Sequence, residues 1–182
     1  MKFLVRVLNA LGLAYWTVLA YVKLRGVGVV GSGLRAEGPV HIVAMRGAFI
    51  LGRNIRLGPH VRLGSANNAT LQIGNNVSVN QGSVIIACQS VQIGDDSRIG
   101  EYVGICDNDH GWSDPSIPIR KQGFTVKSVT IGRDVWLGRA SVVCKGVSIG
   151  DGGILGAGAI LTKSMPRSQV WAGNPARKIK DR

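Results

Sequence analysis

The chain is poor in aromatic residues and in cysteines, and each shortage narrows what it can be. Aromatic residues make up 5% of the 182 residues, whereas glycine occurs 26 times. This balance is typical of a backbone that turns many tight corners. The three cysteines, Cys88, Cys106 and Cys144, are an odd number at spacings that match no zinc motif or disulfide framework. A reducing cytoplasm is therefore the simplest compartment.

Acidic residues are also scarce. Lysine and arginine total 22 against 10 acidic residues, which gives a formal net charge of +12. This excess predicts an anionic partner, such as nucleotide phosphates, anionic lipid or nucleic acid. Nucleic acid is the least favoured of the three, because the basic residues lack interleaved aromatics and a known binding motif. Basic residues crowd the C-terminal end of the chain: Lys163, Arg167, Arg177, Lys178, Lys180 and Arg182.

An aliphatic residue recurs every six residues from position 51 onward, and most of these residues are followed directly by glycine. The members are Leu51, Leu57, Leu63, Ile73, Val79, Ile85, Ile93, Ile99, Ile105, Ile131, Leu137, Val143, Ile149, Leu155 and Leu161. A period of six fits neither an α-helix nor a simple strand. It fits a chain that turns a corner every six residues, so that three sides close a triangular coil of about eighteen residues. The sequence therefore predicts an all-β solenoid, a parallel β-helix of hexapeptide repeats.

One break in the repeat is much longer than the others. Between Ile105 and Ile131 about twenty residues exceed one repeat, and this excess predicts a long protruding loop over about 106–128. The loop contains His110, one of only three histidines. We assign residues 26–38 to a linker, 39–170 to the β-helix catalytic domain and 171–182 to a basic C-terminal tail.

Residues 1–25 lie outside the repeat and form an amphipathic helix with a narrow polar stripe. An interfacial, membrane-associating helix fits this pattern best, because basic residues stand at both ends and Trp16 lies near the boundary. A helix that only caps the open end of the solenoid is the alternative. A spanning helix is disfavoured by the polar stripe, and a cleaved signal peptide by Arg6 in the apolar stretch.

Several motifs resemble those of the hexapeptide-repeat acyltransferases. They are Asn108-Asp109-His110-Gly111, Asp134-Val135-Trp136-Leu137-Gly138, Gly156-Ala157-Gly158-Ala159, Leu161-Thr162-Lys163 and Ala172-Gly173-Asn174-Pro175-Ala176-Arg177-Lys178-Ile179. Within that family the chain is similar to the sugar O-acetyltransferases of bacterial polysaccharide and lipopolysaccharide pathways. The resemblance covers residues 40–180. It implies a left-handed β-helix and a homotrimer, with acetyl-CoA in the groove between neighbouring prisms and no metal.

The resemblance also implies roles for individual residues. His110 matches the catalytic histidine, Asn80 an asparagine that holds the acceptor, and Trp136 a wall of the acceptor pocket. The expected coenzyme contacts are Arg139, Ala157, Thr162, Lys163, Arg177 and Lys178. Arg139 stands where related galactoside-type enzymes carry a serine that supports the oxyanion, so the backbone amide at that position is the alternative donor. Trp136 could instead pack at an interface, and Asn80 could belong to an asparagine ladder between coils.

The chemistry can be argued from the residues themselves. A sugar hydroxyl attacks a thioester only with a base in reach, and histidine has a suitable pKa. Asp107 and Asp109, or Asp114, could orient the ring of His110, and we also assign Asp107 and Asp109 to the acceptor site. A rival route through an acetylated Cys106 is disfavoured, because that residue fills a small packing position.

The expected acceptor is a sugar or a lipid-linked oligosaccharide, and the expected location is cytoplasmic, on the inner face of the cytoplasmic membrane. The alternatives are N-acetylation of an amino sugar, a carbonic-anhydrase-like metalloenzyme, and a non-catalytic scaffold.

Overall fold

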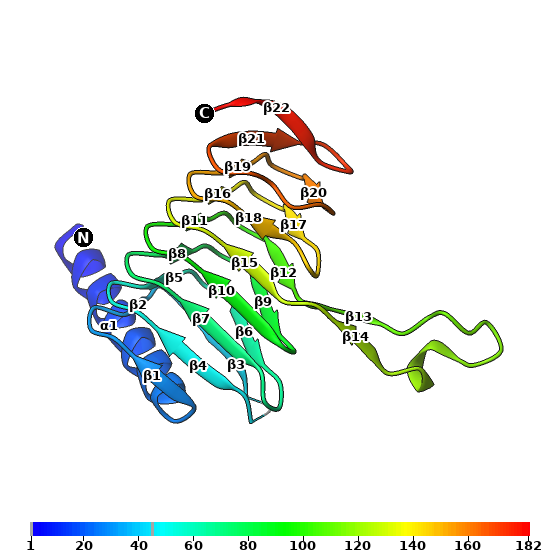
Figure 1. Ribbon diagram of the computed structural model, residues 1–182. Coiled ribbons are helices and arrows are strands. Elements are labelled where there is room, and N and C mark those ends of the chain that lie inside the picture. The colour runs from blue at the N-terminus through cyan, green and yellow to red at the C-terminus, as the bar shows by residue number, and fades with distance from the viewer. Residues whose placement is uncertain (1, 45) are drawn as a thin grey trace.

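The computed structural model describes residues 2–44 and 46–182, and it confirms the left-handed parallel β-helix predicted from the repeat (Figure 1). Three parallel sheets form the sides of a triangular prism. Sheet A contains β1 (Gly28–Val30), β4 (Ala48–Leu51), β7 (Thr70–Ile73), β10 (Ser90–Ile93), β15 (Val129–Ile131) and β18 (Ser148–Ile149).

Sheets B and C complete each coil. Sheet B contains β2 (Arg35–Ala36), β5 (Arg56–Leu57), β8 (Ser78–Val79), β11 (Arg98–Ile99), β16 (Trp136–Leu137), β19 (Ile154–Leu155), β21 (Gln169–Ala172) and β22 (Arg177–Asp181). Sheet C contains β3 (Val40–Ala44), β6 (Val61–Ser65), β9 (Val84–Ala87), β12 (Gly104–Cys106), β17 (Val142–Val143) and β20 (Ile160–Leu161). We call the bends between consecutive sheets the AB, BC and CA corners.

The core is the stack of inward aliphatic side chains. Val79, Ile99 and Leu137 pair in register on successive strands of sheet B, and all three are fully buried. Each coil therefore rests its apolar side chain on the next coil at the strand spacing of about 4.8 Å. Glycine at the corners permits this spacing. A Cβ on Gly138, for example, would lie 2.5 Å from the backbone nitrogen of Ala157.

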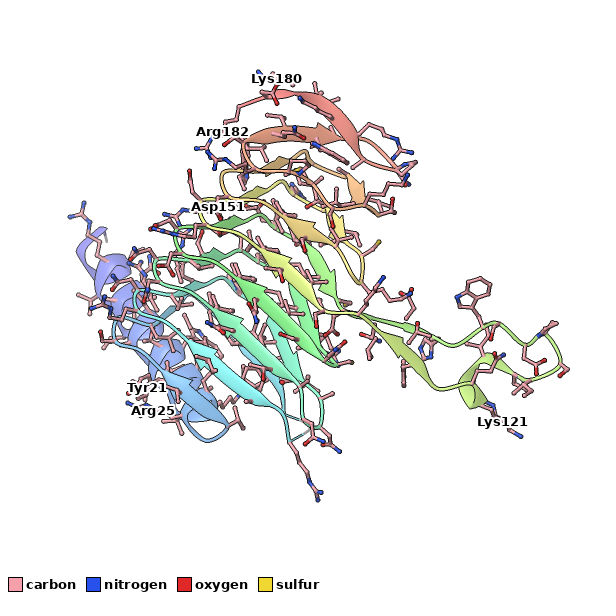
Figure 2. All side chains as sticks on the ribbon, viewed as in Figure 1. Tyr21, Arg25, Lys121, Asp151, Lys180 and Arg182 are labelled. Atoms are coloured by element: carbon pink, nitrogen blue, oxygen red, sulfur yellow. The ribbon has the colours of Figure 1, made fainter. Side chains whose placement is uncertain are left out.

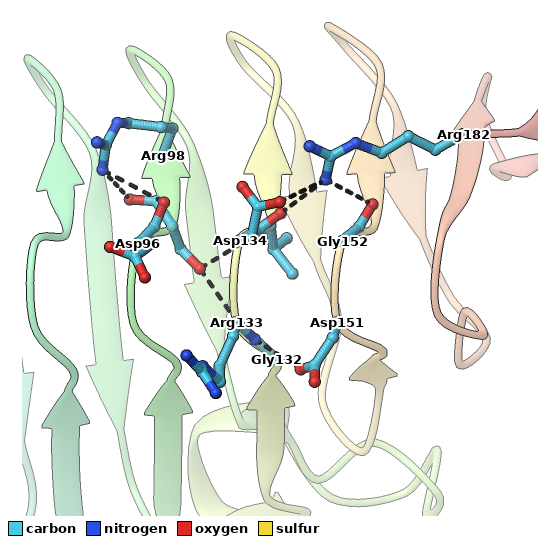
Figure 3. A network of polar contacts seen from close by, with 10 residues as sticks. Asp96, Arg98, Gly132, Arg133, Asp134, Asp151, Gly152 and Arg182 are labelled. Carbon is cyan, nitrogen blue, oxygen red and sulfur yellow. Dashed lines mark hydrogen bonds and ion pairs between the residues drawn. The ribbon is translucent and has the colours of Figure 1, made fainter.

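Asparagine and aspartate side chains line the AB corner. Asn54, Asn76 and Asp96 all have positive φ angles, and each amide of the asparagines donates to the next side chain in the stack. Short polar residues tolerate this left-handed conformation better than others. Farther along the same corner, Arg182 pairs with the carboxylate of Asp134 at 2.8 Å (Figure 3). This ion pair ties the end of the chain to the middle of the prism.

Two of the expected segment boundaries were wrong. The proposed linker 26–38 contains β1 and β2, which pair with β4 and β5 and belong to the first coil. The proposed C-terminal tail 171–182 forms most of the antiparallel pair β21–β22, which continues sheet B. In both places backbone pairing with the neighbouring coil orders a segment that lies outside the repeat traced from Leu51 onward. The basic side chains Lys180 and Arg182 project from this end of the prism (Figure 2).

The helix α1 (Lys2–Arg25) lies against the first coil. Ala20 and Leu24 are buried there, and the hydroxyl of Thr17 accepts the backbone N–H of Ala36 at 3.0 Å. The polar stripe, which includes Thr17, therefore turns toward the prism. An apolar face points away from it and is exposed: Leu8, Leu11, Tyr15, Val18 and Val22. By length and composition, the segment Val5–Arg25 could cross a membrane.

The long insertion is a hairpin that protrudes from the CA corner (Figure 1). It leaves the prism after β12 and contains β13 (Asn108–His110), a short 3-10 helix (Ile119–Lys121) and β14 (Phe124–Val126). β13 and β14 pair antiparallel, and the chain then re-enters sheet A at β15. Lys121 lies near the far end of this hairpin (Figure 2). The protruding loop predicted over about 106–128 is thus an ordered arm.

Candidate active site

A cavity of about 390 Å³ lies at the BC corner, beside the ends of the sheet B strands. It brings together four residues that the sequence placed in the site: Asn80, Trp136, Arg139 and Ala157. Asn80 directly follows β8, and Trp136 projects outward from β16 with 54% of its surface exposed. An exposed indole beside small residues offers the kind of flat apolar wall on which a sugar ring can lie.

Polar neighbours hold the side chains of this cavity. The Nη2 atom of Arg56 donates to Oδ1 of Asn80 at 3.3 Å, and the guanidinium of Arg139 lies 5.5 Å from the ring centre of Tyr102. Glu101 also lines the cavity. The contact between Arg56 and Asn80 was not predicted, since the two residues are far apart in the chain and meet only through coil stacking.

Two further residues expected to contact the coenzyme lie at the same corner, at the C-terminal end of the prism. Arg177 begins β22 directly after the turn that follows β21, and its Nη1 atom donates to the carbonyl of Ala176. Lys178 pairs with Asp181 at 2.7 Å. Both basic side chains are exposed and can meet an anionic ligand that extends along the BC corner.

His110 lies elsewhere, at the end of β13 on the hairpin. Its ring is exposed and contacts Phe124, with 4.6 Å between the ring centres. Asp109 pairs with Lys145, which follows β17 at the CA corner. Thr162 and Lys163 follow β20 at that corner and are exposed. The expected site residues therefore form two groups in one chain, one at the BC corner and one at the CA corner.

Asp107 neither lines an acceptor site nor orients His110, the two roles that the sequence predicted for it. Its side chain is fully buried, and its carboxylate accepts the backbone N–H groups of Cys88, Gln89 and Ser90 at 2.6, 2.8 and 2.7 Å. It therefore fixes the neighbouring turn and the base of the hairpin, and does not face an acceptor. Asp114 is likewise engaged: hydrogen bonds from Ser116 lower the pKa of its carboxyl group.

The environment of the cysteines disfavours a thiolate nucleophile. Burial raises the pKa of the Cys106 thiol, and the negative charge of Asp107 raises it further. Cys88 and Cys144 have raised pKa values for the same leading reason, burial. At neutral pH these thiols stay protonated, whereas only the thiolate attacks a thioester efficiently.

Histidine is not gathered into a metal site in the described part of the chain. His41 and His60 stack on each other with ring centres 5.9 Å apart, on the first two coils. Across residues 2–44 and 46–182, no three histidine, cysteine, aspartate or glutamate side chains are arranged to hold a metal ion.

Comparisons with known proteins find hexapeptide-repeat transferases and acetyltransferases. The family described as bacterial transferase hexapeptide (six repeats) matches residues 128–163. WbbJ of Escherichia coli, named as a lipopolysaccharide biosynthesis O-acetyl transferase, is 35% identical over 74% of this chain and 72% of its own length. A probable acetyltransferase of Mycobacterium tuberculosis is 29% identical over 92% of this chain, which spans 56% of that relative's length.

Solved structures agree with the fold. A maltose O-acetyltransferase from Clostridium difficile superposes with a TM-score of 0.65 at 28% identity, covering 73% of this chain and 70% of that one. The N-acyltransferase AntD from Bacillus cereus gives a TM-score of 0.77 at 21% identity, covering 90% of this chain and 89% of its own. At that identity the likeness to AntD establishes the fold alone.

Proposed function

Because the chain belongs to the hexapeptide-repeat acyltransferases, we propose that it transfers an acetyl group from acetyl-CoA to a hydroxyl group of a sugar. The cavity that Asn80, Trp136, Arg139 and Ala157 share carries this proposal. The residues expected to act together lie at two corners of the prism, separated by sheet C. A single chain cannot close such a site, but a second copy can, if its hairpin reaches the BC corner of its neighbour.

We therefore propose a homotrimer in which each site is shared by two chains. The hairpin of one chain supplies His110, and the BC corner of the next supplies Asn80 and Trp136. Cyclic symmetry repeats this head-to-tail contact three times and closes the ring. The protruding hairpin supports this arrangement, because an arm that leaves the prism and exposes Phe124 is suited to pack on a neighbour.

In this site His110 acts as the general base. An imidazole nitrogen accepts the proton of the sugar hydroxyl while the oxygen attacks the carbonyl carbon of the thioester. The tetrahedral intermediate then collapses, the C–S bond breaks, and the imidazolium returns the proton to the departing thiolate. Asn80 holds the acceptor, and the backbone amide at Arg139 is a candidate donor to the oxyanion. No acetylated enzyme is formed on this route.

The coenzyme is expected to run in the groove between the chains. Ala157 offers its backbone to the pantetheine arm, and the basic side chains Lys163, Arg177 and Lys178 can pair with the phosphates of the coenzyme. Thr162 adds a hydroxyl at the CA corner. Two of the basic residues come from the BC corner and one from the CA corner, so both chains contribute charge.

We further propose that the protein works at the inner face of the cytoplasmic membrane, on a precursor of a surface polysaccharide. The exposed apolar face of α1 supports this location, since an apolar helix face with flanking basic residues inserts into the lipid interface. The name of WbbJ supports a polysaccharide or lipopolysaccharide acceptor. Three helices on one trimer would strengthen a weak attachment by avidity.

Mixed trimers test the shared site. His110→Ala and Asn80→Ala trimers are each expected to lose transfer, measured as thiol release from acetyl-CoA with a panel of sugars; loss of a general base costs about 10²–10⁴-fold. When the two variants are unfolded together in equal amounts and refolded, about one quarter of the sites should be intact. An intact site takes its hairpin from an Asn80→Ala chain and its BC corner from a His110→Ala chain, and chance brings these together in about one quarter of the sites.

The control is each variant refolded alone. A site contained within one chain would regain nothing on mixing, and that result would refute the shared arrangement. The same assay with amino sugars as acceptors tests N-acetylation, the alternative reaction.

A further inference from the structure

A row of arginines follows the outer face of sheet B from α1 to the cavity at the BC corner. Arg35, Arg56, Ser78, Arg98 and Trp136 occupy the same outward register position on five successive strands. The four steps span roughly 19 Å at the usual strand spacing. Three positive side chains thus lead to the indole that walls the cavity.

Arg56 and Arg98 bound a hollow of about 260 Å³ beside that cavity. Asn76 and Ser78 also line it, and Ser78 is nearly buried although its position faces outward. Two contacts link the lining of the hollow to that of the cavity: Arg56 donates to Asn80, and Arg98 pairs in register with Trp136. A group bound in the hollow would therefore contact two arginines that neighbour Asn80 and Trp136 in the wall of the acceptor cavity.

Arg98 is held so that it can bind a further ligand. Its Nη1 atom donates to three backbone carbonyls, those of Asn76, Asp96 and Ser97. The Nη2 and Nε atoms have no hydrogen-bond partner among residues 2–44 and 46–182. A guanidinium that is fixed by one nitrogen loses less conformational entropy on binding and offers its remaining N–H groups to an anion.

Carboxylates near the row do not cancel its charge. Glu37 lies 3.8 Å from Arg35 and 3.7 Å from Arg56, and Glu101 lines the acceptor cavity. Asp96 stands at the AB corner edge of the hollow, where it accepts the side-chain amide of Asn76. The three arginines of the row and Arg139 outnumber these three carboxylates, so the face around the hollow remains positive.

Resting on the proposed function, we infer that the acceptor carries an anionic group beside the sugar that is acetylated, and that Arg56 and Arg98 bind this group. A phosphate and a carboxylate both suit two arginines and a hydroxyl. A phosphate would belong to a sugar linked to a lipid or nucleotide carrier, and a carboxylate to an acidic sugar of the polysaccharide. The row continues to Arg35, which lines a hollow against α1 and so lies at the end that would face a lipid.

Calorimetric titration of the full-length protein tests this inference with four probes: inorganic phosphate, glucose 1-phosphate, glucuronic acid and methyl glucoside. Each titration is run with and without saturating coenzyme A, so that phosphate subsites of the coenzyme are filled in one series. At least one of the two anionic sugars should bind roughly tenfold or more tightly than methyl glucoside, as expected for hydrogen bonds between charged groups. This preference should shrink as salt is added.

The variants Arg56→Gln and Arg98→Gln should each remove most of that preference. Arg62→Gln is the matched control, because Arg62 projects outward from the same coil as Arg56 but on sheet C. A stronger response to glucose 1-phosphate identifies a phosphate-linked acceptor, and a stronger response to glucuronic acid identifies an acidic sugar. Equal affinity for charged and neutral sugars, or an equal loss in Arg62→Gln, would overturn the inference.

The two proposals fail in different ways. Thiol release from acetyl-CoA with neutral sugars, together with no effect of Arg56→Gln and Arg98→Gln on binding, would retain the transferase and refute the anion site. Anion binding that depends on Arg56 and Arg98 without any thiol release would retain the anion site and refute the transferase.

Discussion

Replacement of Asp107 by alanine should destabilise the protein far more than the same change two residues later. Both aspartates lie at the base of the hairpin, and the sequence assigned both to the acceptor site. In the structure Asp107 is buried and accepts three backbone N–H groups, whereas Asp109 is exposed and pairs with Lys145. The two changes therefore remove the same carboxylate from very different surroundings.

The expected size follows from those contacts. Alanine at position 107 leaves three backbone donors without their acceptor, and each buried donor left unsatisfied costs about 1–3 kcal/mol. Water can reach part of the turn, because Gln89 is exposed and Cys88 and Ser90 are only partly buried. We therefore expect a loss of about 3–5 kcal/mol, which corresponds to a melting temperature lower by about 10 °C in a protein of this size. Asp109→Ala removes a surface ion pair and should cost less than about 1 kcal/mol.

Thermal denaturation followed by circular dichroism measures both variants under one condition. Asp107→Asn provides an intermediate case, since the amide keeps one acceptor oxygen but replaces the other with a donor that faces N–H groups. It should fall between Asp107→Ala and the wild type. Equal melting temperatures for Asp107→Ala and Asp109→Ala would mean that the buried carboxylate does not hold the turn, and the reasoning would be wrong.

Three more predictions concern the thiols, the helix and the coil spacing. Cys106→Ala should keep most of the transfer activity, measured as thiol release. In the wild type, burial raises the pKa of the Cys106 thiol. The contribution of this thiol to stability should therefore hold at neutral pH and decline as pH rises through the raised pKa, as denaturation at several pH values would measure. Leu11→Glu with Val18→Glu should abolish sedimentation with anionic vesicles without lowering the melting temperature, because both side chains lie on the exposed face of α1. Gly138→Ala should lower thermal stability by about 1–3 kcal/mol, whereas Gly104→Ala, whose Cβ would meet only side-chain atoms at 3.8 Å or more, should not.

The repeat predicted most of the fold because each hexad reports one corner. Leu137 and Leu155, eighteen residues apart, stand in register as a coil of that length requires. The first two sides of the first coil were missed although Val30, Ala36 and Ile42 are also six residues apart. Ala36 is small and is followed by a charged residue, so the pattern weakens where α1 covers the end of the prism. Glycine alone is therefore an incomplete marker of a coil.

The candidate site was predicted less completely than the fold. The motif residues Asn80, Trp136, Arg139 and Ala157 do share a cavity. Their separation from His110 follows from which corner each turn occupies, and a motif carries no such information. The buried role of Asp107 and the contact between Arg56 and Asn80 depend on atoms of adjacent coils, so only the stacked structure reveals them.

Because the coils stack at a constant spacing, the number of coils sets the distance between any two points along the prism. The strands of sheet B lead, one coil at a time, from β2, beside α1, to β16, at the cavity. Insertion of one coil between them would move the cavity away from the helix by about 4.8 Å and leave every corner as it was. The distance between the cavity and the helix can therefore change without any change in the chemistry of the site. The number of coils sets the distance, and the side chains at the corners set the chemistry.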